Sequence, residues 1–358
     1  MRGTAACYIF KNNKSLNITK SYKKQFLLLL ALLIVVVFIN ISFGSVSIPF
    51  KDTFSVLIGD GSLKNSWRVI ILNFRIPKAI TAILVGSGLS ISGLLMQTLF
   101  RNPLAGPFVL GISSGAGLGV AILILGGSFF GAFFDDLLIS NWMLMITASL
   151  GAGMVLFAVL LTANRVRNTM SVLIIGLMFG SLSAALISVL SYFSEASKIQ
   201  QYIFWGFGSL GNLTWEQISL FVFIFIISIG GVLFTIKPLN GFLLGENYAK
   251  SVGIHIKKSR TVILVITSIL TGVITAFAGP IAFIGLAVPH ITKLLFKTSN
   301  HKILIPAVAI TGAIILLVCD LIAQLPTSEY TLPINAITSL FGAPVVIWLL
   351  IRKKRIYV

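Results

Sequence analysis

The sequence predicts an all-α integral membrane protein, folded as one bundle of about ten transmembrane helices. The chain is 57% hydrophobic and 10% charged, and its mean hydropathy is +1.02. Its apolar runs, such as FLLLLALLIVVVF from Phe26, approach the ~20 residues that a helix needs to cross ~30 Å of hydrocarbon. They are continuous, whereas barrel strands would alternate. Since backbone polar groups must pair within lipid, we expect helices.

The apolar stretches divide the chain into one transmembrane domain and two terminal tails. Residues 1–24 form a basic tail, residues 25–352 the transmembrane domain and residues 353–358 a second tail. A cleavable signal peptide at the start is the rival interpretation, but no small-x-small cleavage site follows the first apolar run. The expected spans are 25–43, 79–99, 107–126, 142–163, 171–192, 215–236, 260–278, 280–296, 304–325 and 334–351.

The net charge of +18 reports topology rather than a nucleic-acid partner. With the N-terminus inside, cytoplasmic segments carry 21 of the 27 lysines and arginines, whereas Glu246 is the only one of the nine acids placed inside. This distribution follows the positive-inside rule. It predicts a multi-pass membrane protein in contact with lipid and with both termini in the cytoplasm.

The first break in the apolar pattern is RNPLAGPFVLGISSGAG, residues 101–117. Pro103 and Pro107 cannot continue a helix, so we expect a tight cytoplasmic turn and a third span that begins near Pro107. Small residues let membrane helices approach closely, which predicts a central position for this span. These small residues are Gly111, Ser113, Ser114, Gly115, Gly117 and Gly119.

The second break is GPIAFIGLAVPHITK, residues 279–293. Gly279 and Pro280 split a long apolar stretch, and Pro289 is expected to disturb the following span. We interpret His290 as a helix-end residue bonded to freed carbonyls rather than as a metal ligand, because no second ligand is near. The two cysteines have neither disulfide nor metal-ligand spacing. No metal site is predicted.

The third break is the cytoplasmic loop 239–260, which contains LNGFLLGENYAKSVGIHIKKSR. Pro238 is expected to end the sixth span, and Gly245 and Glu246 to form a turn between two short amphipathic segments. Leu243, Leu244, Tyr248 and Val252 give the loop an apolar component that a solvated loop does not need. A surface that receives another protein does need one.

Two external cations, Arg75 and Lys78, flank Pro77 just before the second span. They depart from a topology that otherwise places cations inside. Anchoring to lipid headgroups and docking of an acidic partner are equally compatible with these residues alone.

The chain lacks the residues that would supply its own energy source. It contains no Gly-Lys pair and therefore no Walker-type phosphate loop. Asp320 is the main ionisable residue within a span, and such residues mark ion and proton pathways. A gradient-driven secondary transporter is therefore one rival. A membrane enzyme acting on lipids is another, although no active-site constellation supports it. The residues favour a conduit driven by an energy-supplying partner.

Seven motifs in order resemble the iron-siderophore, haem and vitamin B12 permeases of bacterial ABC importers (FecCD-type, BtuC-like). They are RIPK (75–78), SGLLMQ (92–97), RNPLAGPFVLGISSGAG (101–117), GFGSLGNLTWEQ (206–217), LLGENYAKSVG (243–253), GPIAFIGLAVPH (279–290) and FGAPVVIWLL (341–350). The resemblance covers about residues 45–352. It implies ten helices per subunit, two ATPase subunits, an external substrate-binding protein, and a homodimer or a paired homologous permease.

The resemblance also implies roles for particular residues. The coupling residues that sit in a groove of the ATPase are Leu243, Leu244, Gly245, Glu246, Ala249 and Gly253. Arg75 and Lys78 match the basic side chains that face glutamates of the binding protein, with Lys78 in place of an arginine and its bidentate fork. Gln324 stands where the family usually has a further docking arginine. Asn168, Thr169 and Met170 match the cytoplasmic gate, and spans 5 and 10 line the pathway. The structural breaks comprise Arg101, Asn102, Pro103, Gly106, Gly279, Pro280, Pro289 and His290.

The function that the resemblance implies is a transport subunit of the bacterial cytoplasmic (inner) membrane rather than an enzyme. We expect import of a chelated metal compound, most simply a ferric siderophore, with haem and cobalamin as alternatives. No cofactor is expected on this chain, since ATP and Mg²⁺ belong to the partner ATPase.

Overall fold

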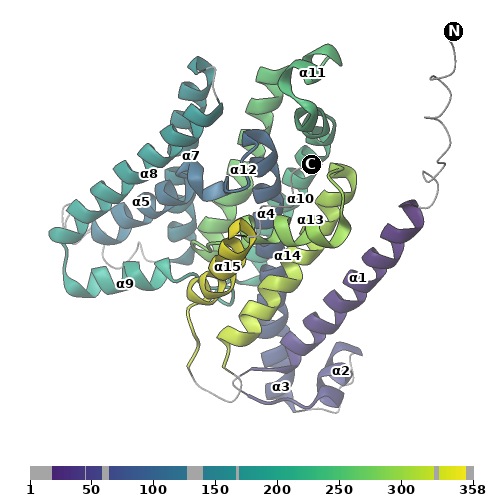
Figure 1. The fold of residues 1–358 in the computed structure, drawn as a ribbon. Helices are drawn as coiled ribbons and strands as arrows, with labels where there is room; N and C mark the ends of the chain where they lie inside the picture. Colours follow the sequence, from purple (N-terminus) through teal and green to yellow (C-terminus); the bar gives the residue numbers. More distant parts are fainter. Residues whose placement is uncertain are drawn as a thin grey trace, which may run out of the picture.

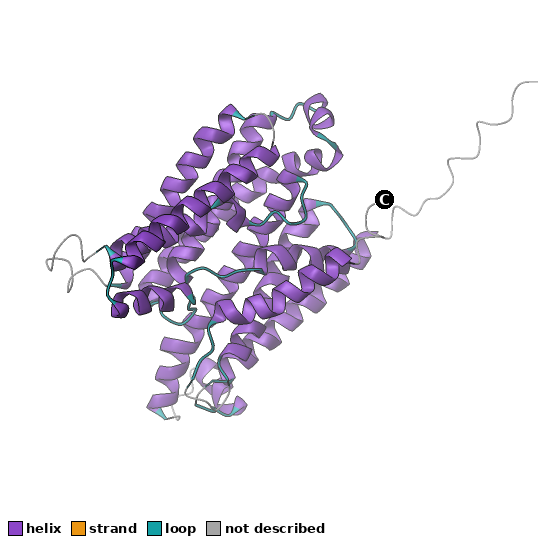
Figure 2. Cartoon of the chain, turned by 60° about the vertical axis from the view of Figure 1, so that its left-hand side comes forward, coloured by secondary structure: helices purple, strands orange, loops and turns teal. Residues whose placement is uncertain are grey.

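The computed structural model describes residues 18–44, 46–58, 64–126, 140–166, 169–325 and 330–351, and the regular structure within these ranges is helical (Figures 1 and 2). The helices are α1 (Ile18–Ser42), α2 (Phe50–Ile58), α3 (Asn65–Ile70), the π-helical turn η1 (Ile71–Arg75), α4 (Ile76–Phe100), the 3₁₀ turn η2 (Pro107–Leu110), α5 (Ile112–Leu125), α7 (Asn141–Arg165), α8 (Thr169–Tyr192), α9 (Ala196–Gly206), α10 (Trp215–Leu244), α11 (Glu246–Ser251), α12 (Ile256–Ala278), α13 (Ile284–Phe296), α14 (His301–Ala323) and α15 (Ile334–Ile351).

The described helices confirm the ten-span bundle. Seven are long and apolar enough to cross a membrane, namely α1, the continuous unit α3–η1–α4, α7, α8, α10, α12 and α14. Three shorter apolar helices, α5, α13 and α15, correspond to the remaining predicted spans. Each predicted stretch therefore contains one apolar helix.

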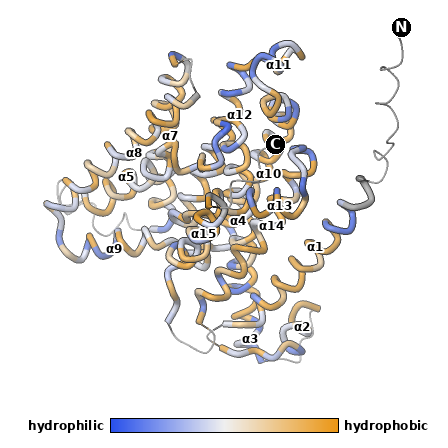
Figure 3. The backbone as a smooth tube through the Cα atoms, viewed as in Figure 1, coloured by the Kyte–Doolittle hydropathy of each residue, from blue (hydrophilic) through white to orange (hydrophobic). Residues whose placement is uncertain are grey.

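The bundle has two distinct ends. Helix α11 lies at one end, whereas α2, α3 and α9 lie at the other (Figure 1). Polar residues gather at α11 and near the beginning of α1, and apolar residues dominate the helices between the ends (Figure 3). We call the end that carries α11 the α11 end, and the end that carries α2, α3 and α9 the α2 end.

Helix α4 is the centre of the bundle. Together with α3 and η1 it forms a 36-residue unit, and 89% of the most apolar segment of this unit is buried inside the bundle. Helix α4 contacts α10, α12, α13 and α14. Two glycine pairs allow this packing: a Cβ on Gly93 would lie 1.7 Å from the Gly285 carbonyl oxygen, and one on Gly86 would lie 2.4 Å from that of Gly312. Backbones approach this closely where both residues are small.

Helix α5 is buried as its small residues predict. A Cβ on Gly115 would lie 2.6 Å from the Gly151 carbonyl oxygen of α7, and one on Gly119 would lie 2.1 Å from that of Thr147. The helix also contacts α8, α9 and α12. Its α-helical part starts at Ile112, after η2 and Gly111, whose φ of +74° favours glycine.

Three local expectations were wrong. Pro238 does not end α10, which continues to Leu244, because Leu239 and Phe242 are buried beyond it and their packing outweighs one missing backbone donor. The eighth span begins its helix at Ile284 rather than at residue 280, after Phe283 in the left-handed region. His290 lies within α13, which continues through Pro289 to Phe296, rather than at a helix end. Helices α2, α3 and α9 were not predicted.

Candidate functional site

The predicted coupling residues form a compact turn at the α11 end. Helix α10 ends at Leu244, Gly245 adopts φ +118° and ψ 149°, and α11 begins at Glu246. Gly253 closes the turn with φ +80°. Leu244 is 66% exposed, and Leu243, Tyr248 and Val252 are also exposed. Thus the end of α10, the short helix α11 and the residue after it present apolar side chains outwards, beside two positions that favour glycine.

Ala249 fixes α11 to the bundle. Its side chain is fully buried and lies against Gly241 of α10, where a Cβ would be 3.5 Å from the Ala249 Cβ. The Ala249 N–H donates to Gly245 O over 2.8 Å, and its carbonyl accepts from the Ile254 N–H over 2.9 Å. Glu246 lies 3.5 Å from Arg260 of α12. These contacts attach the turn to both α10 and α12.

The first sequence break contacts the turn formed by residues 243–253, which we call the coupling turn. Arg101, in the left-handed region at the end of α4, donates from Nη2 and Nε to the Phe242 carbonyl over 2.6 and 3.1 Å. Asn102 Oδ1 accepts from Leu104 N–H, and His290 Nε2 lies 2.9 Å from Pro103 O. His290 therefore has a backbone carbonyl partner, which belongs to the loop after α4 rather than to its own helix.

The second break contributes to both ends of the molecule. Gly279, with φ +74°, packs against Gly208 just beyond α9, where a Cβ would be 2.8 Å from the Gly208 Cα. Pro280 belongs to the non-helical entry to α13, and the Ala282 N–H donates to Asn335 Oδ1 over 3.0 Å. Gly106 lies against Leu286, so the loop after α4 contacts α13 at two points.

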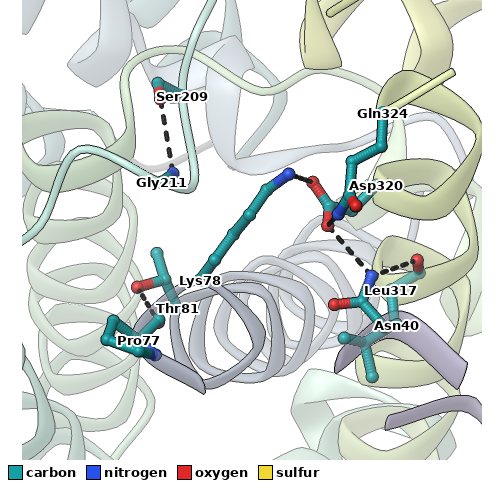
Figure 4. Close-up of polar contacts among 9 residues, drawn as sticks. All are labelled: Asn40, Pro77, Lys78, Thr81, Ser209, Gly211, Leu317, Asp320 and Gln324. Carbon is teal, nitrogen blue, oxygen red and sulfur yellow. Dashed lines mark hydrogen bonds and ion pairs between the residues drawn. The ribbon is translucent and has the colours of Figure 1, made fainter. Parts of the chain in front are cut away.

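At the α2 end, Asn40, Lys78, Asp320 and Gln324 form what we call the Asp320 cluster (Figure 4). Lys78 Nζ reaches from α4 to within 2.9 Å of Asp320 Oδ1. The other carboxylate oxygen accepts from Gln324 Nε2 over 2.7 Å and from Asn40 Nδ2 over 2.9 Å. Asp320 is 2% exposed. The cluster thus neutralises a buried carboxylate and connects α1, α4 and α14.

Arg75 lies apart from this cluster and is 8% exposed. Its guanidinium donates to the carbonyls of Ile41, Ser42 and Val46, which surround the end of α1. Lys78 keeps a partly exposed side chain, whereas Gln324 is buried. The docking roles stay predictions, and Lys78 is the more exposed of the two cations.

The predicted gate lies at the junction between α7 and α8. Asn168 falls outside the described residues, Thr169 begins α8, and Met170 is 43% exposed. Its gating role is untested. Within the described ranges, no group of three or more His, Cys, Asp or Glu residues is placed to hold a metal ion.

Sequence reasoning missed Asn40 and the convergence of Lys78 and Gln324 on one carboxylate. The available signal for Asn40 was an amide in an otherwise apolar span. Such a group needs a partner within the membrane. Its partner, however, is 280 residues away and could not be read from spacing.

Comparisons with known proteins agree with this architecture. The model of the FecCD transport family matches residues 32–352. The vitamin B12 import system permease protein BtuC of Klebsiella pneumoniae is 37% identical over 288 residues, which cover 80% of this chain and 84% of that protein. The BtuC protein of Salmonella typhimurium is 36% identical over 289 residues, with 80% and 85% covered.

Solved structures show the same fold. A structure described as an inward-facing conformation of a metal-chelate type ABC transporter aligns with a TM-score of 0.80 and 28% identity, covering 92% of this chain and 100% of that chain. PsaBC from Streptococcus pneumoniae, solved in complex with Fab, aligns with a TM-score of 0.53 and 16% identity, covering 84% and 95%. With its multi-span helical fold, this chain belongs to the FecCD transport family, as a permease of the bacterial ABC importers.

Proposed function

We propose that this chain forms the membrane pathway for import of a chelated metal compound, driven by ATP hydrolysis on two separate ATPase subunits. The coupling turn carries the proposal. Its exposed Leu244 and Tyr248 form an apolar surface, and the buried Ala249 transmits force from it to the bundle. An exposed apolar turn on a rigid anchor suits insertion into a groove of another protein.

The proposed cycle uses the two ends of the bundle in turn. A loaded binding protein docks at the α2 end, outside the cell, near Lys78. ATP and Mg²⁺ bind to the ATPases at the α11 end, in the cytoplasm, and their movement shifts α11. Helices α8 and α15 then open alternately to the two sides, in a homodimer or a pair of homologous permeases. The gate at Asn168, Thr169 and Met170 closes the cytoplasmic exit.

Two substrate classes compete. The motifs led us to expect a ferric siderophore, whereas the relatives at 37% and 36% identity are named vitamin B12 import permeases, which favours cobalamin. Haem is a third chelate. Uptake into proteoliposomes that contain this chain with its ATPase and binding protein tests them, with each ligand supplied separately. We expect ATP-dependent accumulation of one ligand. Failure of the ATPase to bind would contradict the importer proposal.

The variant Gly245→Val tests the coupling turn. A β-branched residue is strained at φ +118°, so the chain must redirect α11 away from its groove. We expect ATP-driven uptake to fall at least tenfold, while the melting temperature in detergent stays within a few degrees of the parent, because the site lies at the surface. The control Ser251→Ala, in the same helix, should retain uptake. Full uptake by Gly245→Val would remove the coupling role.

A further inference from the structure

A cavity of about 660 Å³ lies at the α11 end, between the last turns of α4 and α13, the beginning of α14 and the end of α10. Three basic side chains line it: Arg101, Lys293 and Lys297. Among the described residues that line it there is no aspartate or glutamate. None of the coupling, docking or gating roles above uses this cavity, although Leu243 forms part of its wall.

The cations of the cavity lack a counter-charge within the described chain. The nearest polar partner of Lys293 Nζ is Gln97 Oε1, at 3.5 Å, and the ion pairs found among the described residues involve neither Lys293 nor Lys297. Glu246 is the one acid that the topology places at this end, and it pairs with Arg260. Cations gathered in a partly desolvated cavity without an anion are costly, so the site is incomplete as it stands.

Two further polar side chains of the cavity already have partners. His301 lies 2.9 Å from Thr98 Oγ1 through Nε2 and 2.8 Å from Asn240 Oδ1 through Nδ1. Arg101 uses two donors for Phe242 O. The groups left to bind an incoming anion are therefore the two lysine ammonium groups and the remaining donors of Arg101.

The walls show what kind of anion fits. Leu243 and Leu294 line the cavity, and both are exposed. The cavity lies where membrane-spanning helices end, which is the level of the lipid headgroups. An occupant with a phosphate and an attached apolar part satisfies both surfaces, and basic pockets between helices at the cytoplasmic side suit anionic headgroups. An acidic side chain of a protein would leave the leucine wall uncovered.

We propose that this cavity binds the phosphate of an anionic phospholipid from the cytoplasmic leaflet, with Lys293 and Lys297 as its direct ligands. The leaflet assignment rests on the proposed function, which places the α11 end in the cytoplasm. Lysine suits the role because its long apolar stem follows the cavity wall while the ammonium meets the phosphate. The bound lipid would lie beside the Arg101–Phe242 contact and so adjoin the coupling turn.

Native mass spectrometry of the full-length chain in detergent tests this site, because it counts retained lipids directly. Phosphatidylglycerol and phosphatidylcholine with identical acyl chains are supplied in turn. We expect phosphatidylglycerol to be retained at least tenfold more tightly than phosphatidylcholine. The double variant Lys293→Gln/Lys297→Gln should lower this ratio about tenfold, since a hydrogen bond to a charged group contributes about a factor of ten to binding. Lys297→Gln alone, at an exposed position, should give part of the loss without affecting folding.

The control variant Lys257→Gln/Lys258→Gln removes the same charge from the first turn of α12 at the same end. It should retain phosphatidylglycerol like the parent. Equal losses in both double variants would reduce the effect to general charge and overturn the proposal. Binding of inorganic phosphate without any preference for phosphatidylglycerol would exclude the lipid as its source. Unchanged lipid retention with weaker binding of the ATPase would assign the cations to that protein instead. Uptake is not measured here, so failure of this site leaves the importer proposal standing.

Discussion

Replacement of Gly93 by alanine is expected to destabilise the folded chain by about 3 kcal/mol, the upper part of the range for overpacked cores. The new Cβ would lie 1.7 Å from the Gly285 carbonyl oxygen, and the obstacle is backbone rather than a flexible side chain. Helices α4 and α13 must therefore separate by more than 1 Å, since unstrained Cβ contacts are longer than about 3 Å. Because α4 also packs against α10, α12 and α14, it cannot move away freely. Thermal unfolding in detergent micelles measures the loss.

Gly153→Ala is the matched control for this substitution. Gly153 lies within α7, and a Cβ there meets no atom within 4 Å. Alanine is a better helix former than glycine by about 1 kcal/mol, so this variant should be unchanged or slightly more stable. The two substitutions are chemically identical, so opposite signs isolate the contact. A Gly93→Ala variant as stable as the parent would show that α4 and α13 are further apart than described.

Replacement of Asp320 by leucine is expected to cost about 3 kcal/mol, and to reduce the yield of monodisperse protein. Removal of one partner from a buried ion pair leaves the other charge uncompensated, at about 3–5 kcal/mol when both are buried. Lys78 retains 22% of its side-chain exposure, which places the loss at the lower limit. Asn40 and Gln324 would lose their common acceptor as well. Thermal unfolding and size-exclusion chromatography report the effect.

The double variant Lys78→Met/Asp320→Leu tests whether the charge or the carboxylate itself matters. Well-packed apolar replacements of a buried pair are often neutral, so we expect the part of the loss that comes from the unpaired Lys78 to be recovered. The part that comes from Asn40 and Gln324, which still lack their acceptor, should remain. Glu246→Gln provides a comparison, because its pair with Arg260 is 3.5 Å long and 46% exposed on the glutamate side, worth less than about 1 kcal/mol. ATP-driven uptake by the double variant would exclude an obligatory coupling carboxylate. Because Lys78 also belongs to the proposed docking surface, uptake lost despite full stability would favour the gradient-driven rival only where the binding protein still binds the double variant.

The ten spans could be predicted because each depends on a local property, the apolar length of a segment. The central position of α5 was also readable, since its glycines and serines lie close together in the sequence. Helix α9 was missed because it is short and its residues 196–206 mix polar and apolar types. Continuation of α10 through Pro238 was missed for a different reason. Local rules give the cost of a proline but not the burial of Leu239 and Phe242 beyond it.

The sequence allowed individual residues of the candidate site to be named, but it did not predict how they are arranged in space. The coupling motif occupies one stretch of chain, so its exposed apolar face could be predicted from its own residues. Arg101 and Phe242, by contrast, are 141 residues apart, and their contact depends on how α4 and α10 end beside each other. Arg75 shows the same limit. A cation beside a proline gives no indication that the three carbonyls at the end of α1 surround it.

The continuous helical unit from Asn65 to Phe100 extends from the α2 end to the α11 end of the bundle. At 1.5 Å per residue its 36 residues extend for about 54 Å, well beyond the ~30 Å of the hydrocarbon layer. One extremity lies beyond Lys78 and the Asp320 cluster, and the other ends at Arg101 beside the coupling turn. A tilt of about 10° around the middle would swing each extremity by about 5 Å in opposite directions. Within the described residues the π-helical turn Ile71–Arg75 interrupts its α-helical ladder. We therefore expect bending at this turn, near the α2 end, while Ile76–Phe100 moves as a unit.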